Sequence, residues 1–269
     1  GITEIGIEDQ QVSLAEYRQM ERELAGKNLK EASHILREMR QVKDDQEVEI
    51  LRRAIEITDK AFTAILDKIQ PGMREDEISL ELEYCLRKMG ASGRSFDYIV
   101  ASGYRAALPH GVATAKSMQS GEFVTMDFGA ICQGYCSDFT RTVFIGKPEA
   151  KHTEVYNLVL EAQLAAIDSI KPGMTGREVD AVARDIISGA GYGEYFGHGL
   201  GHSLGLEIHE APNLSPREEK VLQPGMVVTV EPGIYLPGWG GVRIEDVVLV
   251  TNNGVEVLTQ STKQFIIID

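Results

Sequence analysis

The chain contains an internal repeat that spans most of its length and ends, in each copy, on acidic residues. The segment SGEFVTMDFGA (120–130) aligns without a gap on PGMVVTVEPGI (224–234), which places Asp127 on Glu231. Downstream, GYCSDFTRTVFI (134–145) aligns on GGVRIEDVVLV (240–250), where Asp138 can fall on Glu245. Four carboxylates that face one another in a hydrophobic core repel unless cations neutralise them. The repeat therefore predicts a metal site.

The repeat continues upstream into helical sequence. IQPGMREDEISLELEYCLRKMGA (69–91) aligns on IKPGMTGREVDAVARDIISGAGY (170–192). Each half thus reads as a helix, a Pro-Gly-Met turn, a second helix and then strands that end in carboxylates. A period of about a hundred residues is too long for a solenoid unit. Duplication of one α+β half, with pseudo-two-fold symmetry and the site on the axis, accounts for it.

Apolar spacing and turn residues predict the individual elements. Residues 13–40 look helical but irregular, and strand clusters then alternate with paired helices. This order predicts the α+β class, with helices covering the outer face of a curved sheet. We expect helices at about 44–69, 75–89, 152–170 and 176–188, and strands near 96–101, 122–131, 135–145, 226–235, 241–251, 255–259 and 264–268.

Composition excludes several classes of protein. With 269 residues, 43% of them hydrophobic, the chain can bury a large core. A net charge of −14 argues against nucleic acid and anionic membrane surfaces as partners. No apolar run is long enough to predict a membrane span. Three cysteines imply no disulfide framework and fit a reducing cytoplasm.

Histidines gather in the same regions as the acids. Four of the six histidines lie in candidate site segments, one in the loop SGYRAALPHG and three in a glycine-rich stretch, 197–209. Two of the latter are four residues apart, as in a helical zinc pair, but the surrounding glycines predict extended or turning backbone instead. The four are His110, His198, His202 and His209.

One imidazole together with four carboxylates is a hard, oxygen-rich ligand set. We expect Mn²⁺ or Co²⁺ foremost, with Zn²⁺ or Fe²⁺ as alternatives. Because carboxylates can bridge, this set suffices for two divalent ions about 3.5–4 Å apart that share a water molecule. Such a water ionises near neutral pH, and the resulting hydroxide attacks a polarised carbonyl group.

The chain resembles the pita-bread metallopeptidases, and within them the Xaa-Pro branch of prolidases and aminopeptidases P. The match spans roughly residues 41–269. It implies a pita-bread fold, in which a curved antiparallel sheet is covered by helices. The motifs that carry the resemblance are ALPHG (107–111), MDFGA with SDFTRT (126–130, 137–142), GHGLGH with GLEIHE (197–210), VEPGIY (230–235) and GGVRIED (240–246).

The resemblance also implies roles for individual residues. Asp138 and Glu245 would bridge the two metals, and Glu231 would in addition carry the proton of the attacking water. His209 would stabilise the carbonyl oxygen of the tetrahedral intermediate. His110 and His198 would hold substrate around the scissile bond. The full set of implied metal ligands is Asp127, Asp138, His202, Glu231 and Glu245.

Tyr235 and Arg243 resemble the family's secondary site residues. Arg243 stands two positions before Glu245, so on a strand both side chains would point into one cavity. Two alternatives follow for Arg243. It offsets negative charge by pairing with Asp246 or a metal ligand, or it binds the C-terminal carboxylate of a dipeptide.

The N-terminus departs from the family pattern, which usually places a creatinase-like domain before the catalytic one. We expect residues 1–40 to be a helical remnant of that domain and residues 41–269 to form the catalytic domain. The resemblance implies a homodimer that cleaves the bond between an N-terminal residue and proline in small peptides. A methionine-aminopeptidase-like enzyme, a metal-free creatinase-like hydrolase and a non-catalytic binding module are the alternatives.

Overall fold

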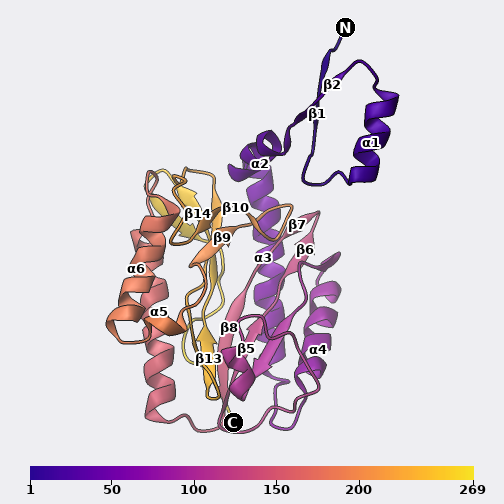
Figure 1. The fold of residues 1–269 in the computed structure, drawn as a ribbon. Helices are drawn as coiled ribbons and strands as arrows, with labels where there is room; N and C mark the ends of the chain where they lie inside the picture. Colours follow the sequence, from indigo (N-terminus) through magenta and orange to yellow (C-terminus); the bar gives the residue numbers. More distant parts are fainter.

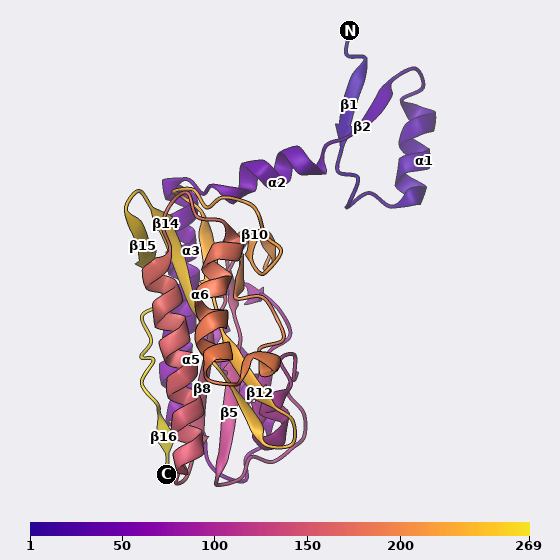
Figure 2. The same cartoon turned by 60° about the vertical axis from the view of Figure 1, so that its left-hand side comes forward.

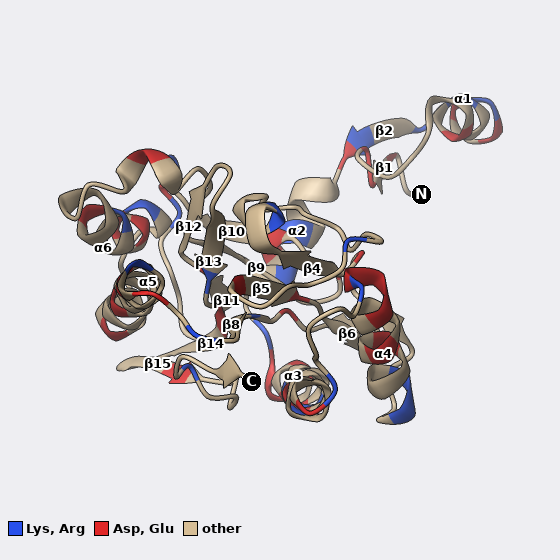
Figure 3. Ribbon diagram, turned by 90° about the horizontal axis from the view of Figure 1, so that it is seen from below, with Lys and Arg blue, Asp and Glu red and all other residues tan.

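Strands occupy the centre of the molecule, and two pairs of long helices lie on their outer side (Figure 1, Figure 3). The structure, a computed structural model, describes residues 1–269. The α+β class predicted from the sequence is confirmed. The helices are α1 (Leu14–Glu23), α2 (Ser33–Gln41), α3 (Asp45–Leu66), α4 (Glu75–Lys88), α5 (Ala150–Ser169) and α6 (Gly176–Gly189), with 3₁₀ turns at Gly103–Ala107 and Gly193–Tyr195.

The N-terminal segment stands away from the rest of the chain in both ribbon views (Figure 1, Figure 2). Strand β1 (Glu4–Ile7) pairs in parallel with β2 (Asn28–Glu31), and α1 connects them. The expectation of a helical, irregular segment holds for α1 and α2, but it missed the two strands. Each strand has only four residues: β1 alternates in exposure over just two periods and β2 does not alternate, so the period-two signal is too short to identify a strand.

The long helices begin where the sequence supplies caps. The Asp44 side chain accepts hydrogen bonds from the first-turn amides of α3, and the Glu47 carboxylate accepts a hydrogen bond from the Asp44 amide. Thr175 and Glu178 form the same capping box at α6. In the two Pro-Gly-Met turns, Gly72 and Gly173 have φ of 92° and 95°, a left-handed conformation that favours glycine. The repeat is thus visible in the backbone.

The strands form two main sheets, one in each half of the repeat. One has the order β16-β8-β5-β4 and the other β10-β9-β11-β14-β15, and pairing is antiparallel except between β16 and β8. Smaller pairings join β12 to β13 and β3 to β6 and β7. The strands are β3 (Gly93–Arg94), β4 (Ile99–Ser102), β5 (Glu122–Asp127), β6 (Ala130–Cys132), β7 (Tyr135–Cys136), β8 (Thr140–Ile145), β9 (Gly201–Ser203), β10 (Glu210–Leu214), β11 (Val227–Val230), β12 (Gly233–Leu236), β13 (Gly240–Arg243), β14 (Asp246–Thr251), β15 (Gly254–Val257) and β16 (Ile267–Ile268).

Four of the long strands predicted from hydrophobicity are each divided in two. The breaks fall at residues 128–129, 137–139, 231–232 and 244–245. Each break contains or directly follows one of the repeated acids. A carboxylate at a strand end can turn out of the ladder into the space between the sheets, so the interruptions are what position the site. None of the helices has the length and apolar character needed to cross a membrane.

Candidate active site

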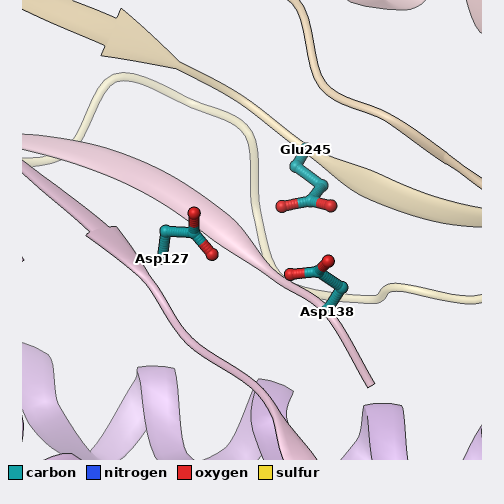
Figure 4. Close-up of side chains that lie close together, drawn as sticks. All are labelled: Asp127, Asp138 and Glu245. Carbon is teal, nitrogen blue, oxygen red and sulfur yellow. The ribbon is translucent and has the colours of Figure 1, made fainter. Parts of the chain in front are cut away.

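Three carboxylates from separate parts of the chain converge in the middle of the molecule. Asp127 ends β5, Asp138 lies between β7 and β8, and Glu245 lies between β13 and β14. One oxygen from each lies within 4.8 Å of the others, and the three groups point toward one another in Figure 4. Asp138 and Glu245 are buried, at 6% and 1% exposure. The repeat therefore brings its acids together, as the sequence predicted.

Thr140, the first residue of β8, connects the two halves of this cluster. It is the register partner of Asp127 in the β5–β8 ladder. Its hydroxyl donates to Oε2 of Glu245 at 2.7 Å, and its carbonyl accepts from the Glu245 amide at 3.1 Å. Thr140 thus fixes where Glu245 lies relative to Asp127.

His202 and Glu231 complete the set of five expected ligands. Nε2 of His202 lies 3.4 Å from Oδ2 of Asp138 and 3.4 Å from Oε1 of Glu231. Nδ1 of the same ring lies 3.1 Å from the carbonyl oxygen of Ser203. When Nδ1 donates its proton to that carbonyl, Nε2 is left as the nitrogen that faces the carboxylates, the arrangement common in histidine ligands.

Thr229, two residues before Glu231 on β11, orients both of these groups. Its hydroxyl oxygen accepts from the backbone amide of His202 at 3.0 Å and donates to Oε1 of Glu231 at 3.1 Å. Sequence reasoning did not assign roles to Thr140 or Thr229. For both a signal existed, because the repeat aligns Thr229 with Thr125 and Thr140 lies in the SDFTRT motif (137–142).

The cluster fits a divalent cation on the basis of its unsatisfied atoms. Oδ1 of Asp127 and Oε1 of Glu245 are buried and have no hydrogen-bond partner. Buried polar atoms are nearly always satisfied, so two orphaned carboxylate oxygens in one cluster point to a missing positive partner. Carboxylate oxygens together with one imidazole are ligands that first-row divalent metals accept.

The electrostatics of the site agree with that interpretation. The pKa of Asp127 is raised to about 7, chiefly by burial; Arg243 opposes this rise, and the neighbouring Asp138 and Glu231 add to it. Burial and the other acids likewise raise the pKa of Glu245 well above its ordinary value. Although burial lowers the pKa of His202, the carboxylates of Asp138 and Glu231 raise it to about 9. All three pKa shifts reflect an excess of negative charge at a buried site.

Arg243 lies against the cluster and is held by protein acceptors. Nη2 donates to Oδ2 of Asp127 at 2.6 Å, Nη1 to the hydroxyl of Tyr235 at 2.8 Å, and Nε to the hydroxyl of Thr140 at 3.1 Å. Nη1 also approaches the carbonyl of Pro109 at 3.3 Å. Of the alternatives drawn from the sequence, these contacts favour pairing with a ligand carboxylate. The pairing with Asp246 was wrong, because Asp246 is engaged by Arg141 and Lys263.

The Tyr235 hydroxyl extends this hydrogen-bond network from Arg243 to His198. Nε2 of His198 lies 2.8 Å from the Tyr235 hydroxyl, and Nδ1 lies 2.7 Å from the carbonyl of Gly199. Since Arg243 donates to the tyrosine oxygen, the hydroxyl proton is free to be donated to Nε2. Burial, and next the charge of Arg243, lower the pKa of His198 to about 4. His198 is therefore a neutral imidazole at ordinary pH.

The remaining expected site residues line a cavity of about 600 Å³ that opens beside the carboxylates. His110 enters it from the loop after β4, and His209 from the loop between β9 and β10. The His209 ring packs edge-on against His202, with ring centres 4.5 Å apart. Apolar side chains share the wall, namely Phe96, Ile99, Val112 and Ile208.

Comparison with known proteins identifies the group of proteins with this site. The sequence model of metallopeptidase family M24 matches residues 49–252. The chain belongs to this family. Members of the M24 family act through divalent metals, and an acidic cluster beside one histidine is a suitable set of ligands for such ions. The acidic cluster of Asp127, Asp138 and Glu245 is compatible with such a metal site.

Relatives of this M24 metallopeptidase match it over nearly its whole length. An Xaa-Pro dipeptidase of Pyrococcus horikoshii is 46% identical over 266 residues, covering 99% of this chain and 76% of the relative. The structure of an Xaa-Pro dipeptidase from Bacillus anthracis superposes with a TM-score of 0.96 at 52% identity, covering 98% of this chain and 74% of that one. An X-Pro aminopeptidase from Thermotoga maritima gives 0.96 at 44% identity, with 99% and 76% coverage. The expected pita-bread fold is confirmed.

Proposed function

We propose that this M24 metallopeptidase hydrolyses the bond between an N-terminal residue and proline in small peptides. One observation carries the proposal. Asp127, Asp138 and Glu245 converge with His202 and Glu231 in a chain whose relatives are named Xaa-Pro dipeptidase. Of the functions that the sequence left open, this one accounts for both the ligand cluster and the relatives.

The five ligands would hold two divalent cations, with Asp138 and Glu245 as bridges. When bound, the cations polarise the scissile carbonyl and make a water molecule nucleophilic near neutral pH. Glu231 would accept the proton of that water; its position at the cavity wall and the hydrogen bond from Thr229 to its Oε1 support this role. It would then pass the proton to the departing proline nitrogen.

The histidines would act on the substrate rather than on the metals. The ring of His209 lies in the cavity wall beside His202, so its N–H can donate to the carbonyl oxygen as negative charge develops there. His198 is fixed as a neutral tautomer by Gly199 and Tyr235, and with His110 it would hold the substrate backbone. Tyr235 would serve this network and not the chemistry directly.

The cavity suits a substrate that contains proline. The imide nitrogen of an Xaa-Pro bond carries no hydrogen, so the wall beside it needs no acceptor for that atom. Apolar side chains such as Phe96, Ile99 and Ile208 can pack against the flat ring. Mn²⁺ or Co²⁺ are the metals proposed, ahead of Zn²⁺ or Fe²⁺, because oxygen ligands dominate the set.

Three further proposals concern the whole protein. Residues 41–269 form the catalytic unit, since every ligand lies there and α2 leads directly into α3. Three free cysteines fit a reducing compartment, and we place the enzyme in the cytoplasm. The active form would be a homodimer, which sedimentation of the purified protein tests.

A substrate panel tests the function. Ala-Pro, Ala-Pro-Ala and Ala-Ala are incubated with protein loaded separately with Mn²⁺ and with Co²⁺, and products are identified by mass spectrometry. Cleavage of the two proline peptides, with Ala-Ala left essentially intact, is the expected result. Equal turnover of Ala-Ala would remove proline from the proposed specificity. The ratio between the first two peptides separates a dipeptidase from an aminopeptidase.

A further inference from the structure

The loop between β9 and β10 carries His209 and Ile208 into the wall of the cavity. Its two ends are neighbours, because Ser203 at the end of β9 and Glu210 at the start of β10 are partners in the antiparallel ladder. Residues 204–209 therefore form a closed hairpin loop. The geometry at its base decides where the loop, and with it His209, points.

A single buried lysine holds both ends of this loop. Nζ of Lys43 lies 3.1 Å from Oε2 of Glu210 and 3.2 Å from the hydroxyl of Ser203. The side chains of Lys43 and Glu210 are 1% and 6% exposed. The Ser203 hydroxyl donates in turn to the carbonyl of Val227 on β11. One ammonium group thus joins the two ends of the loop and, through Ser203, connects them to β11, the strand that precedes Glu231.

The backbone of Lys43 is itself fixed. Its amide donates to the carbonyl of Gly225 at 2.8 Å, and Val42 forms a bridge with Met226 immediately before β11. Gly225 has φ of 89°, and an added Cβ there would lie 2.8 Å from a methyl group of Val42. The linker between α2 and α3 therefore cannot slide along β11, which makes Lys43 a rigid anchor.

The position of His209 depends on the Lys43 contacts, because the His209 side chain is not held by hydrogen bonds of its own. The ring makes no hydrogen bond to the protein and touches His202 only edge-on. Other hydrogen bonds hold the loop backbone: Glu210 Oε1 accepts from the Glu207 amide at 3.2 Å, and the Gly205 carbonyl accepts from the Cys136 amide at 2.7 Å. The carboxylate of Glu210 is thus shared between Lys43 and the loop itself.

Stability alone gives little reason for a buried ion pair at this place. Removing two charges from water costs several kcal/mol per ion, and an apolar pair of similar volume is often as stable. We propose that the Lys43–Glu210 pair is a positioning element that fixes the His209 loop for catalysis. This inference rests on the role proposed above for His209, which acts on the substrate carbonyl.

A double-mutant cycle on the metal-loaded full chain tests the inference. Lys43→Met should lower kcat on Ala-Pro by about 10- to 100-fold, the loss expected from misplacing a catalytic group by about 1 Å. KM and metal content should change little. In the His209→Ala background the same substitution should have almost no further effect, because the two act through one group. Effects that multiply would overturn the inference, since Lys43 would then act by another route.

A second variant keeps the test valid if Lys43→Met alone fails to fold. Lys43→Met/Glu210→Gln removes both charges and retains the acceptor for the Glu207 amide, so no unpaired buried charge remains. We expect near-normal resistance to denaturant with kcat still reduced. Wild-type kcat in this variant would overturn the inference. The control is Arg52→Met, which breaks a 2.6 Å ion pair with Glu256 on the far strand β15 and should leave kcat unchanged.

A measurement independent of turnover separates this inference from the proposed function. In metal-free protein, the imidazole nitrogen signals of His209 should shift in Lys43→Met and not in Arg52→Met. Unshifted signals would overturn the positioning role whatever the substrate. Conversely, shifted signals in a protein that cleaves no Xaa-Pro bond would support the positioning role while rejecting the function.

Discussion

The guanidinium of Arg243 donates to the carboxylate of Asp127 over 2.6 Å, and its other donors are taken up by Tyr235, Thr140 and Pro109. Asp127 is therefore oriented before any ligand arrives. One of its oxygens is fixed by Arg243, and the other, Oδ1, is left without a partner and is free to bind a cation. Arg243 partly neutralises the cluster while directing this free oxygen.

This relationship predicts the outcome of removing Arg243. Arg243→Ala should weaken metal binding by about 10- to 100-fold, as is typical when a residue that orients a metal ligand is lost. The loss of activity should be equal for Ala-Pro and Ala-Pro-amide at saturating metal. Metal titration by calorimetry and KM for both substrates check the two parts. A loss about 1.5–3 kcal/mol greater for the free acid would instead show that Arg243 binds the substrate carboxylate.

Substitution of Asp138 or Glu245, the two acids proposed to bridge the metals, should remove metal and activity together. Asp138→Asn and Glu245→Gln each delete a negative charge from the centre of the cluster and leave a neutral amide oxygen, a much weaker ligand for a divalent cation. Elemental analysis of the purified variants is the measurement. Asp97→Asn is the control, because Asp97 lines the same cavity yet pairs with Arg94 at the surface. Full metal content in either bridging variant would reject the ligand assignment.

Metal removal should also lower stability. The cations bind only the folded arrangement of ligands, so at a hundred times Kd they stabilise it by about 2.7 kcal/mol per site. Chelation should therefore lower the midpoint of thermal unfolding, and added Mn²⁺ should restore it. An unchanged midpoint would mean that the cluster holds no cation in the folded protein.

His209→Ala should lower kcat by about 10²–10³, the usual loss when one donor to a developing oxyanion is removed. Metal content should stay normal because His209 is not among the converging ligands. The control is His34→Ala, an exposed histidine on α2. A variant that loses metal would make His209 a ligand and contradict the role proposed for it.

Local sequence signals predicted much of this molecule, for physical reasons. The capping box at Asp44 and the glycines after Pro71 and Pro172 act within a few residues, so helix ends follow from sequence. The repeat placed the acids at equivalent positions, and the structure brings Asp127, Asp138 and Glu245 together.

Contacts between distant segments could not be predicted in the same way. Lys43 and Glu210 are 167 positions apart, and Arg243 and Asp127 are 116 apart. No periodicity or cap links such pairs, because tertiary packing alone decides which strand ends meet. The short parallel strands β1 and β2 were missed for a related reason. Their pairing is established across α1, and with four residues each they are too short for alternation to identify them.

His198 provides a pH-dependent prediction whose sign follows from its environment. Burial and the nearby Arg243 lower its pKa to about 4 from an ordinary 6.5. Between these values the unfolded chain binds a proton that the folded chain excludes. The stability contributed by neutral His198 is therefore complete above about pH 6.5 and declines as the pH falls toward 4.

The comparison that isolates this contribution is the free energy of unfolding of metal-free wild type against His198→Gln. The advantage of the wild type should be larger at about pH 7.5 than at about pH 5. Nitrogen NMR should show His198 still neutral at about pH 5, with the proton on Nδ1, because Gly199 accepts from that atom and Tyr235 donates to the other. A midpoint near 6.5 for His198 would mean that its ring is solvated, and the Arg243–Tyr235–His198 network would then not exist in solution.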